Sequence, residues 1–406
     1  MKSSNFLKMV GGIFIVIGTC LGAGLLALPI GTAKCGFTYS TALMFGCWVI
    51  MSLGAFYILE VTQWLPKGSN LISAAKATLG KWGEAVSWLL YLLLCYSLLC
   101  AYIGGGSDIL TLILSLLNIS LSQFVSAILF VVVLGTVVFK GVRSLDMVNR
   151  CLMIIKFSAL FLLIALIAPH IKTDNFIVGN STYALSALTI AISSFGFAIV
   201  VPTLLDYFDG NVNKVRLILF IGTLIPFIIY TAWNFVIMGS ISTYGPDGLI
   251  HILDSGEATS GLVNSLKNVI KVKSITEISR LFASVCMLTS FLGVSLSFTD
   301  FIADGFKIKK TFIGKWKIML ITYIPPLVIV SVYPQIFIKA LNYAGVIVLL
   351  LLVTVPAAMT WRGRYVKKIS KGYKVVGGKI FLLLTFIVSA LIVVCRIFQE
   401  LELLIF

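Results

Sequence analysis

The sequence has little charge and almost no histidine. Of its 406 residues, 11% are charged and 59% are hydrophobic, and the mean hydropathy is +1.07. Soluble domains carry about 25% charged residues, so a soluble globular protein is excluded. The two histidines, His170 and His251, fall outside the long apolar segments. Any proton carrier inside those segments must therefore be a lysine or a carboxylate.

Acidic residues are also scarce, 15 against 31 lysine and arginine residues, which gives a net charge of +16. The basic residues are spread between apolar segments, whereas a nucleic-acid partner needs them gathered on one face or tail. The eight cysteines fall mostly inside apolar segments, so they indicate neither a disulfide framework nor a metal site. His, Asp and Glu do not cluster at one depth, which disfavours the alternative of an intramembrane enzyme. The sequence indicates no cofactor.

Long apolar runs are abundant. At about 1.5 Å per residue a helix needs roughly 20 apolar residues to cross a bilayer. The first run is too long for a signal-peptide core and is interpreted as a retained helix. We therefore expect an all-α polytopic membrane protein with about eleven crossings, at residues 10–33, 37–65, 84–116, 122–139, 148–168, 182–208, 214–238, 277–303, 316–332, 335–360 and 379–398.

The basic residues predict the orientation of these crossings. With a cytoplasmic N-terminus, 22 of the 31 lysine and arginine residues fall in inner segments, 8 fall in outer ones, and Lys156 remains inside a crossing. Cytoplasmic loops carry an excess of positive residues. The N-terminus is therefore expected in the cytoplasm and the C-terminus outside.

Small residues interrupt the first and sixth crossings. The first contains Gly18-Thr19-Cys20-Leu21-Gly22-Ala23-Gly24 ahead of Pro29, and the sixth contains Ser193-Ser194-Phe195-Gly196-Phe197 ahead of Pro202. Glycine and proline weaken a helix, and in hydrocarbon the freed backbone groups need other partners. Paired breaks in corresponding segments are typical of carriers built from two inverted repeats of five helices. Close helix packing is the alternative for each break taken alone.

The two breaks together suit a zwitterion. Amides at the start of the outer half-helix favour a carboxylate, and carbonyls at the ends of the inner half-helices accept from an ammonium. Mid-span aromatic residues suit an aromatic substrate, or simply pack in a chain that is 12% aromatic. Gly22, Gly24 and Gly196 are expected to tolerate no side chain and to need positive φ. The residues expected to bind substrate are Thr19, Cys20, Gly22, Ala23, Gly24, Tyr96, Tyr102, Ser193, Ser194, Phe195, Gly196 and Phe197.

Ionisable residues inside crossings are functional hypotheses by default. Lys156 is the deepest cation, Glu60 lies near the inner end of the second crossing, and Thr289 and Ser290 supply hydroxyls in the eighth. Burial would favour the neutral amine of Lys156. The carbonyls near Gly18 and Thr19 and the hydroxyls of Thr289 and Ser290, which its side chain could reach, would favour its ammonium. We therefore expect Lys156, Glu60, Thr289 and Ser290 to take part in proton coupling. Snorkelling of Lys156 toward the inner interface and ordinary helix packing of the others are the alternatives.

Charged residues near the inner end predict a gate. Asp300 and Asp304 share one face of the eighth crossing, where Lys8 could reach them as a cytoplasmic gate. A solvated interface cluster is the alternative. Asp108, in the outer third of the third crossing, is expected to face an outer vestibule.

Two loops are expected to contain helices. Residues 69–80 predict a short amphipathic helix on the inner side that ends at Gly80. Residues 239–276 are longer than a connector requires, and Leu262, Leu266, Val269 and Ile270 recur at helical spacing. This outer helix would act as a lid or cap the bundle.

These residues resemble a known family. The sequence is similar over nearly its whole length to the hydroxy and aromatic amino acid permeases, most of all to their tyrosine-specific members. The resemblance implies a leucine-transporter-like core at 1–360, with helices 1–5 at about 10–168 and helices 6–10 at about 182–360, followed by a basic loop and an eleventh helix at 361–406. It rests on Gly18-Thr19, Gly22-Ala23-Gly24, Pro29, Leu59-Glu60-Val61, Asn149-Arg150, Lys156, Ser194-Phe195-Gly196-Phe197, Pro202, Tyr207, Asp209-Gly210-Asn211, Ser290-Phe291-Leu292-Gly293-Val294, Asp300, Ala303-Asp304, Tyr333-Pro334 and Tyr343-Ala344-Gly345.

The resemblance also implies proton-coupled uptake of an aromatic amino acid across a bacterial inner membrane, with the C-terminus in the periplasm. Lys156 stands where sodium-driven carriers of this fold place an ion. Relatives commonly carry His-Gly after the Phe-Gly-aromatic triplet, whereas this chain has Ala198-Ile199. That change leaves the choice among tyrosine, tryptophan and phenylalanine open and excludes coupling through that histidine. Sodium coupling and a passive channel remain alternatives.

Overall fold

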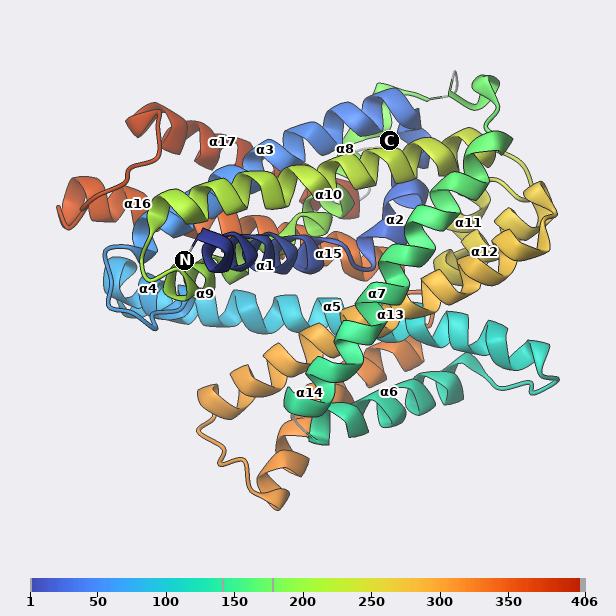
Figure 1. Ribbon diagram of the computed structural model, residues 1–406, viewed down its shortest axis with the longest axis horizontal. Coiled ribbons are helices and arrows are strands. Elements are labelled where there is room, and N and C mark those ends of the chain that lie inside the picture. The colour runs from blue at the N-terminus through green and yellow to red at the C-terminus, as the bar shows by residue number, and fades with distance from the viewer. Residues whose placement is uncertain (1, 141, 177–178, 402–406) are drawn as a thin grey trace.

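The computed structural model describes residues 2–140, 142–176 and 179–401, and every regular element in them is a helix (Figure 1). The α-helices are α1 (Lys2–Cys20), α2 (Gly24–Gly31), α3 (Gly36–Thr62), α4 (Leu71–Leu79), α5 (Lys81–Leu116), α6 (Gln123–Lys140), α7 (Val142–Ile167), α8 (Ala184–Ser194), α9 (Val201–Tyr207), α10 (Val212–Ser240), α11 (Leu249–Ser255), α12 (Ala258–Ile270), α13 (Lys273–Gly305), α14 (Phe312–Val332), α15 (Phe337–Leu349), α16 (Val355–Trp361) and α17 (Gly378–Glu400). The 3₁₀-helices are η1 (Ala33–Cys35), η2 (Ala168–His170), η3 (Thr173–Phe176), η4 (Ser181–Tyr183) and η5 (Gly196–Val200), and the π-helical turns are η6 (Leu350–Thr354) and η7 (Arg362–Val366).

Ten helical stretches among the described residues are long and apolar enough to cross a membrane, and the bent pair α1–α2 makes an eleventh crossing. The prediction of about eleven crossings is therefore confirmed. The tenth crossing is longer than predicted, because the helix continues through η7 to Val366. Residues 402–406, the end of the predicted C-terminal unit, lie outside the described part.

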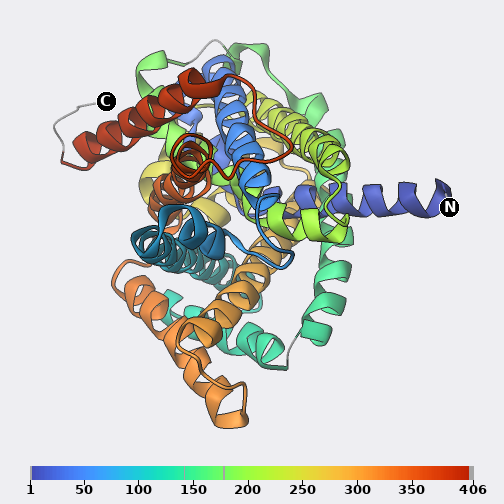
Figure 2. The same ribbon diagram turned by 90° about the vertical axis from the view of Figure 1, so that its left-hand side faces the viewer.

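The crossing helices form one bundle, in which most of the long helices run roughly horizontally in Figure 1. The helix α4 and the loop between α16 and α17 lie at one end, and α11 and α12 lie at the other. Figure 2, which shows the left-hand end of Figure 1, has the first half of α1 projecting out of the bundle. The two ends of the molecule are therefore packed differently.

Both predicted breaks are present. The helix α1 ends at Cys20, α2 begins at Gly24, and the two axes differ by 49°. The helix α8 ends at Ser194, and Phe195 leaves helical geometry with φ −107° and ψ 32° before η5 begins. Because α2 packs against α8 and α1 against η5, the two breaks adjoin in the core. They form the centre from which the site is built.

The expected backbone reason for the glycines is wrong. None of Gly22, Gly24 and Gly196 is among the residues with positive φ in the described chain. Any side chain could therefore adopt the backbone angles of these three positions. A requirement for glycine at the breaks must therefore come from the atoms that an added Cβ would meet.

Both predicted loop helices form. At the end of the bundle that the sequence predicts to be the inner one, α4 begins with a capping box between Asn70 and Ser73 and ends at Gly80, whose φ is +82°. In the outer loop, α12 buries Leu262 and Leu266 and packs against α5 and α13. Each end of the bundle is therefore covered by a short amphipathic helix.

Candidate functional site

The break between α1 and α2 exposes backbone amides. The amides of Leu25 and Leu26 donate back to Gly22 and Ala23, whose carbonyls precede them by three residues. The Ala23 amide donates to Ser290 Oγ on α13 at 3.0 Å. Within the described residues, the amides of Gly22 and Gly24 have no protein acceptor. Two amides at the start of α2 are thus available to an anion, on the side where the helix dipole favours negative charge.

The carbonyls at the end of α1 receive donors from two other helices. Lys156 Nζ on α7 donates to the Leu21 carbonyl at 2.6 Å, and Tyr230 Oη on α10 donates to the Cys20 carbonyl at 2.6 Å. One turn along α10, Trp233 Nε1 donates to the Leu25 carbonyl in α2 at 2.6 Å. The broken backbone is therefore held by side chains, as buried polar groups in hydrocarbon require.

Lys156 is buried, with 1% of its surface exposed, so its ammonium does not snorkel to an interface. Besides Leu21, it lies 3.4 Å from Thr289 Oγ1 on α13. The sequence placed Lys156 near the carbonyls of Gly18 and Thr19, but its partner is Leu21. The expected contact with Ser290 is replaced by the bond from Ala23 to that hydroxyl. Lys156 therefore links α7, the first break and α13.

The second break presents a carbonyl to the same place. Tyr230 Oη lies 3.1 Å from the Ser194 carbonyl, so one hydroxyl reaches both breaks. The hydroxyls of Ser193 and Ser194 donate back to the Ile190 carbonyl within α8. The Ser194 carbonyl therefore faces the first break, and the Ser194 hydroxyl lies beside Gly24 while its proton is donated within α8.

The glycines of the two breaks differ in the space around them. A Cβ on Gly22 would lie 2.7 Å from Ser290 Oγ, and one on Gly24 would lie 2.7 Å from Ser194 Oγ and 3.2 Å from Tyr230 Oη. A Cβ on Gly196 would meet only Val348, at 3.9 Å, which is an ordinary contact. The expected crowding is therefore present at the first break and absent at Gly196.

The predicted aromatic residues divide into two groups. Phe195 and Phe197 are fully buried, and the Phe195 ring lies edge-on to Tyr230 with 5.4 Å between centroids. Tyr102 on α5 is 9% exposed. Tyr96 instead donates to the Ile321 carbonyl of α14 at 2.8 Å. Tyr96 thus binds a neighbouring helix and not a break.

Thr19 and Cys20 contribute through their backbone. Thr19 Oγ1 donates to the Ile15 carbonyl at 2.7 Å, and its side chain is exposed. Cys20 is buried, and its carbonyl is the oxygen that Tyr230 binds. Neither side chain supplies a polar group to the space between the breaks.

Glu60 lies away from the breaks in a buried ion pair. Arg364 Nε donates to Glu60 Oε1 at 2.6 Å, the second Arg364 donor binds Oε2, and the Val375 amide also donates to Oε2, at 2.7 Å. Glu60 is fully buried. These contacts give Glu60 a structural role, because they compensate the charge of its buried carboxylate near the end of α3.

The predicted gate residues are apart. Asp300 accepts from Lys310 Nζ at 2.6 Å, and Asp304 is exposed. The Lys8 ammonium lies over the ring of Tyr207, 5.3 Å from its centroid. The expected pair between Lys8 and the α13 carboxylates is therefore not formed in this conformation, since α1 projects away from the bundle (Figure 2).

Asp108 binds the outer loop helix. Its carboxylate accepts from the amides of Thr259 and Ser260, at 3.1 and 2.8 Å, and from Thr259 Oγ1 at 2.8 Å. These amides belong to the first turn of α12, which has no intrahelical acceptor for them. Asp108 on α5 therefore caps α12 from another helix and fixes it over the outer end of the bundle.

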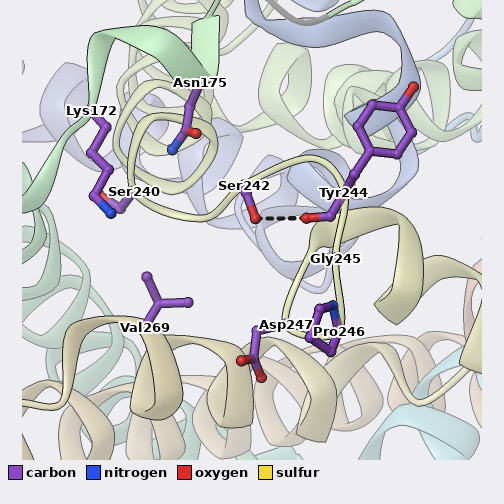
Figure 3. A pocket seen from close by; sticks show the side chains of 9 residues that line it. All are labelled: Lys172, Asn175, Ser240, Ser242, Tyr244, Gly245, Pro246, Asp247 and Val269. Atoms are coloured by element: carbon purple, nitrogen blue, oxygen red, sulfur yellow. Dashed lines mark hydrogen bonds between the residues drawn. The ribbon is translucent and has the colours of Figure 1, made fainter.

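A pocket of about 240 Å³ lies in the loops at the outer end of α10 (Figure 3). Lys172 and Asp247 lie on opposite sides of it, and Asp247 accepts from Asn268 at 2.7 Å. No residue that lines it belongs to either break. We assign it no part in the central site.

Sequence reasoning missed Tyr230 and Trp233. They are three positions apart on α10, so they face the same side of the helix. Buried Tyr and Trp side chains usually find hydrogen-bond partners. That spacing was a signal. It did not distinguish these two from the other aromatic residues of a membrane helix, because the acceptors lie more than 200 residues away in the chain.

Comparison with known proteins places these features in context. The model of the tryptophan/tyrosine permease family matches residues 6–396. The chain is 32% identical over 393 residues to tyrosine-specific transport system 1 of Haemophilus influenzae, covering 95% of each chain. It is 29% identical over 404 residues to glutamine transporter 2 of Aliivibrio fischeri, covering 97% of this chain and all of that one. In fold it resembles a manganese transporter of Eremococcus coleocola, with a TM-score of 0.62 and 18% identity. The match covers 95% of this chain and 85% of that one.

Proposed function

Because the chain belongs to the tryptophan/tyrosine permease family, we propose that it is a proton symporter that imports an aromatic amino acid, tyrosine before tryptophan or phenylalanine. The family consists of permeases and not enzymes, and the chain is a multi-pass membrane protein with the leucine-transporter-like fold. The proposal therefore concerns the substrate, the coupling ion and the direction of transport.

The observation that carries the proposal is the meeting of the two breaks. The free amides of Gly22 and Gly24 suit a carboxylate. The carbonyls of Cys20 and Ser194, which share the Tyr230 hydroxyl, suit an ammonium. An amino acid carries both groups on one carbon atom, so a single zwitterion satisfies both sets.

Aromatic residues around this place support an aromatic substrate. Phe195 is part of the second break, and its ring lies edge-on to that of Tyr230. Ring contacts of this kind contribute about 0.5–1.5 kcal/mol beyond burial. The relative named as a glutamine transporter makes glutamine the first competitor to test.

Lys156 is the proposed proton carrier, with Thr289 as its second contact. The neutral amine of Lys156 has two protons and its ammonium has three. Only the ammonium can therefore donate to the Leu21 carbonyl and to Thr289 Oγ1 and still carry a third proton. Symport of one proton with a zwitterion moves one net charge, worth about 2.3 kcal/mol per 100 mV. Since about 1.4 kcal/mol corresponds to tenfold, this supports roughly fiftyfold accumulation.

The charge distribution supports the orientation. An odd number of crossings puts the termini on opposite sides, and the basic residues favour a cytoplasmic N-terminus. We therefore propose a bacterial inner membrane protein with a periplasmic C-terminus. Cysteine labelling at Lys2 and at Lys339, from outside and after permeabilisation, measures this directly.

The test is uptake of labelled tyrosine by the purified protein in proteoliposomes. We expect accumulation above equilibrium when an inward proton gradient is imposed, no stimulation by an inward sodium gradient, and strong competition by tyrosine, tryptophan or phenylalanine. Uptake that only equilibrates tyrosine would indicate a channel. Stimulation by sodium alone, or competition by glutamine and not by aromatic amino acids, would overturn the proposal.

A further inference from the structure

Tyr230 bonds to both breaks from a third helix, α10. Its hydroxyl lies 2.6 Å from the Cys20 carbonyl and 3.1 Å from the Ser194 carbonyl, and the residue is fully buried. Each carbonyl ends the first half of its crossing, α1 or α8, where the last carbonyl groups have no intrahelical donor. A single hydroxyl therefore serves two acceptors that come from different crossings.

A tyrosine hydroxyl has only one proton to donate. The shorter bond, to Cys20, takes that proton, and the Ser194 carbonyl is left with an oxygen as its neighbour at 3.1 Å. A buried carbonyl without a donor costs free energy, and the phenolic oxygen can itself accept a hydrogen bond. The Ser194 carbonyl and the Tyr230 oxygen therefore both have room to accept a hydrogen bond. A single group with at least two protons to donate would satisfy both.

An ammonium group has three donors and no acceptor, which matches this need. The acceptors lie beside the proposed carboxylate position, because a Cβ on Gly24 would be only 3.2 Å from Tyr230 Oη. We propose that Tyr230 recognises the α-amino group of the transported amino acid. It donates to Cys20 and accepts, together with the Ser194 carbonyl, from the ammonium. This assignment rests on the proposed function as an amino acid carrier.

The competing explanation is that Tyr230 only ties α10 to the breaks. Trp233 provides the matched control, because it lies one turn along the same face and donates to the Leu25 carbonyl at the same distance of 2.6 Å. An indole N–H donates and cannot accept. Trp233 therefore ties α10 to α2 but offers nothing to an ammonium.

The experiment measures binding of L-tyrosine and of 3-(4-hydroxyphenyl)propanoate, which is tyrosine without its amino group, to purified wild type, Tyr230→Phe and Trp233→Phe. Hydrogen bonds to charged groups contribute about 1.5–3 kcal/mol, so Tyr230→Phe should weaken tyrosine roughly 10- to 100-fold. In the same variant, binding of the deaminated analogue should weaken by less than about threefold. Trp233→Phe should change both ligands by the same factor.

Equal losses of the two ligands in Tyr230→Phe, or the same selective loss in Trp233→Phe, would overturn the inference. The wild type gives a measurement that needs no variant, since the deaminated analogue must bind at least about tenfold more weakly than tyrosine. If wild type binds no aromatic amino acid, the proposed substrate is wrong. L-glutamine and 4-carbamoylbutanoate then form the test pair, and the same selective loss in Tyr230→Phe still decides the role of Tyr230.

Discussion

At the scale of single residues, the first break is stabilised by hydrogen bonds to three other helices. Lys156 comes from α7, Tyr230 and Trp233 from α10, and Ser290 accepts from the break on behalf of α13. Carbonyls at such a break need cations or other donors, because no water is available in hydrocarbon. Here side chains donate to the carbonyls of Cys20, Leu21 and Leu25.

The sharpest residue-scale prediction concerns Lys156. Lys156→Ala should abolish proton-driven accumulation of tyrosine and leave some binding or exchange, because it removes the one cation that contacts the break and keeps the amides of Gly22 and Gly24. Uptake and counterflow in proteoliposomes separate the two activities. Lys315→Ala is the control, since Lys315 also donates to a carbonyl, that of Phe139, at 3.2 Å. Accumulation that persists in Lys156→Ala would make Glu60 the next carrier to test.

Space at the glycines gives a matched pair of variants. Gly24→Ala should weaken tyrosine binding by about tenfold or more, because the new Cβ would meet Ser194 Oγ at 2.7 Å and shift the Gly24 amide away from the proposed carboxylate, and a hydrogen bond to a charged group contributes about 1.5–3 kcal/mol. Gly196→Ala should bind nearly as wild type, since its Cβ meets only Val348 at 3.9 Å. Binding is measured on purified protein whose helical content is checked by circular dichroism. A larger loss in Gly196→Ala than in Gly24→Ala would place substrate against the second break instead of the first.

At the scale of elements, the inner end is held by the segment that follows α16. Arg362 donates to the Leu79 carbonyl and Lys367 to the Ala77 carbonyl, both at the C-terminal end of α4, where cations are favoured. Arg364 binds Glu60 on α3. The π-helical turn η7 carries two of these three residues, so the extra length of the tenth crossing ties α3 and α4 together.

The elements were more predictable than their contacts. Hydrophobic run length gave the eleven crossings, and the glycines with Pro29 and Pro202 gave both breaks, because these signals act within about 20 residues. The partner of Lys156 was placed on the right break but two residues away, since a side chain of several bonds reaches more than one carbonyl. Glu60 and Tyr230 were not resolved, because Arg364 and the Cys20 carbonyl lie 304 and 210 residues away.

The outer helix α12 supplies a prediction of pH dependence. Burial and the nearby Asp108 carboxylate raise the pKa of Glu257, just before α12, above its ordinary value of 4.5. The docked helix therefore favours protonated Glu257. This contribution to docking is fully present below about pH 4.5 and is lost as the pH rises through the docked pKa.

Amide hydrogen exchange across α12, corrected for its intrinsic rate, should therefore become faster between about pH 4 and about pH 8. Glu257→Gln should remove this part of the pH dependence, because its side chain does not titrate. Glu277→Gln, an exposed glutamate paired with Arg280 on α13, should leave it unchanged. Slower corrected exchange at the higher pH, or the same profile in Glu257→Gln, would exclude Glu257 as the cause.

At the scale of the whole molecule, the two ends of the bundle are in different states. At the outer end, Asp108 holds α12 in place. At the inner end, the first half of α1 projects from the bundle (Figure 2), and Phe6 and Leu7 on it are exposed. In the proposed orientation, the end from which α1 projects lies on the cytoplasmic side. Alternating access then requires α1 to return toward the bundle when the carrier turns outward.

That movement predicts a change of partner for Asp300. Its carboxylate now pairs with Lys310, and the return of α1 would bring Lys8 to the same inner end of α13. Lys8→Glu should therefore lower the rate of tyrosine uptake about two- to fivefold, since exposed pairs contribute about 0.5–1 kcal/mol. The double variant Lys8→Glu with Asp300→Lys should restore the uptake rate, because it reverses both charges of the proposed gate pair. The double variant Lys310→Glu with Asp300→Lys should stay slow, because it restores only the pair that does not close the inner side. Rescue by the Lys310 pair alone would show that Asp300 serves the loop after α13 and that the gate lies elsewhere.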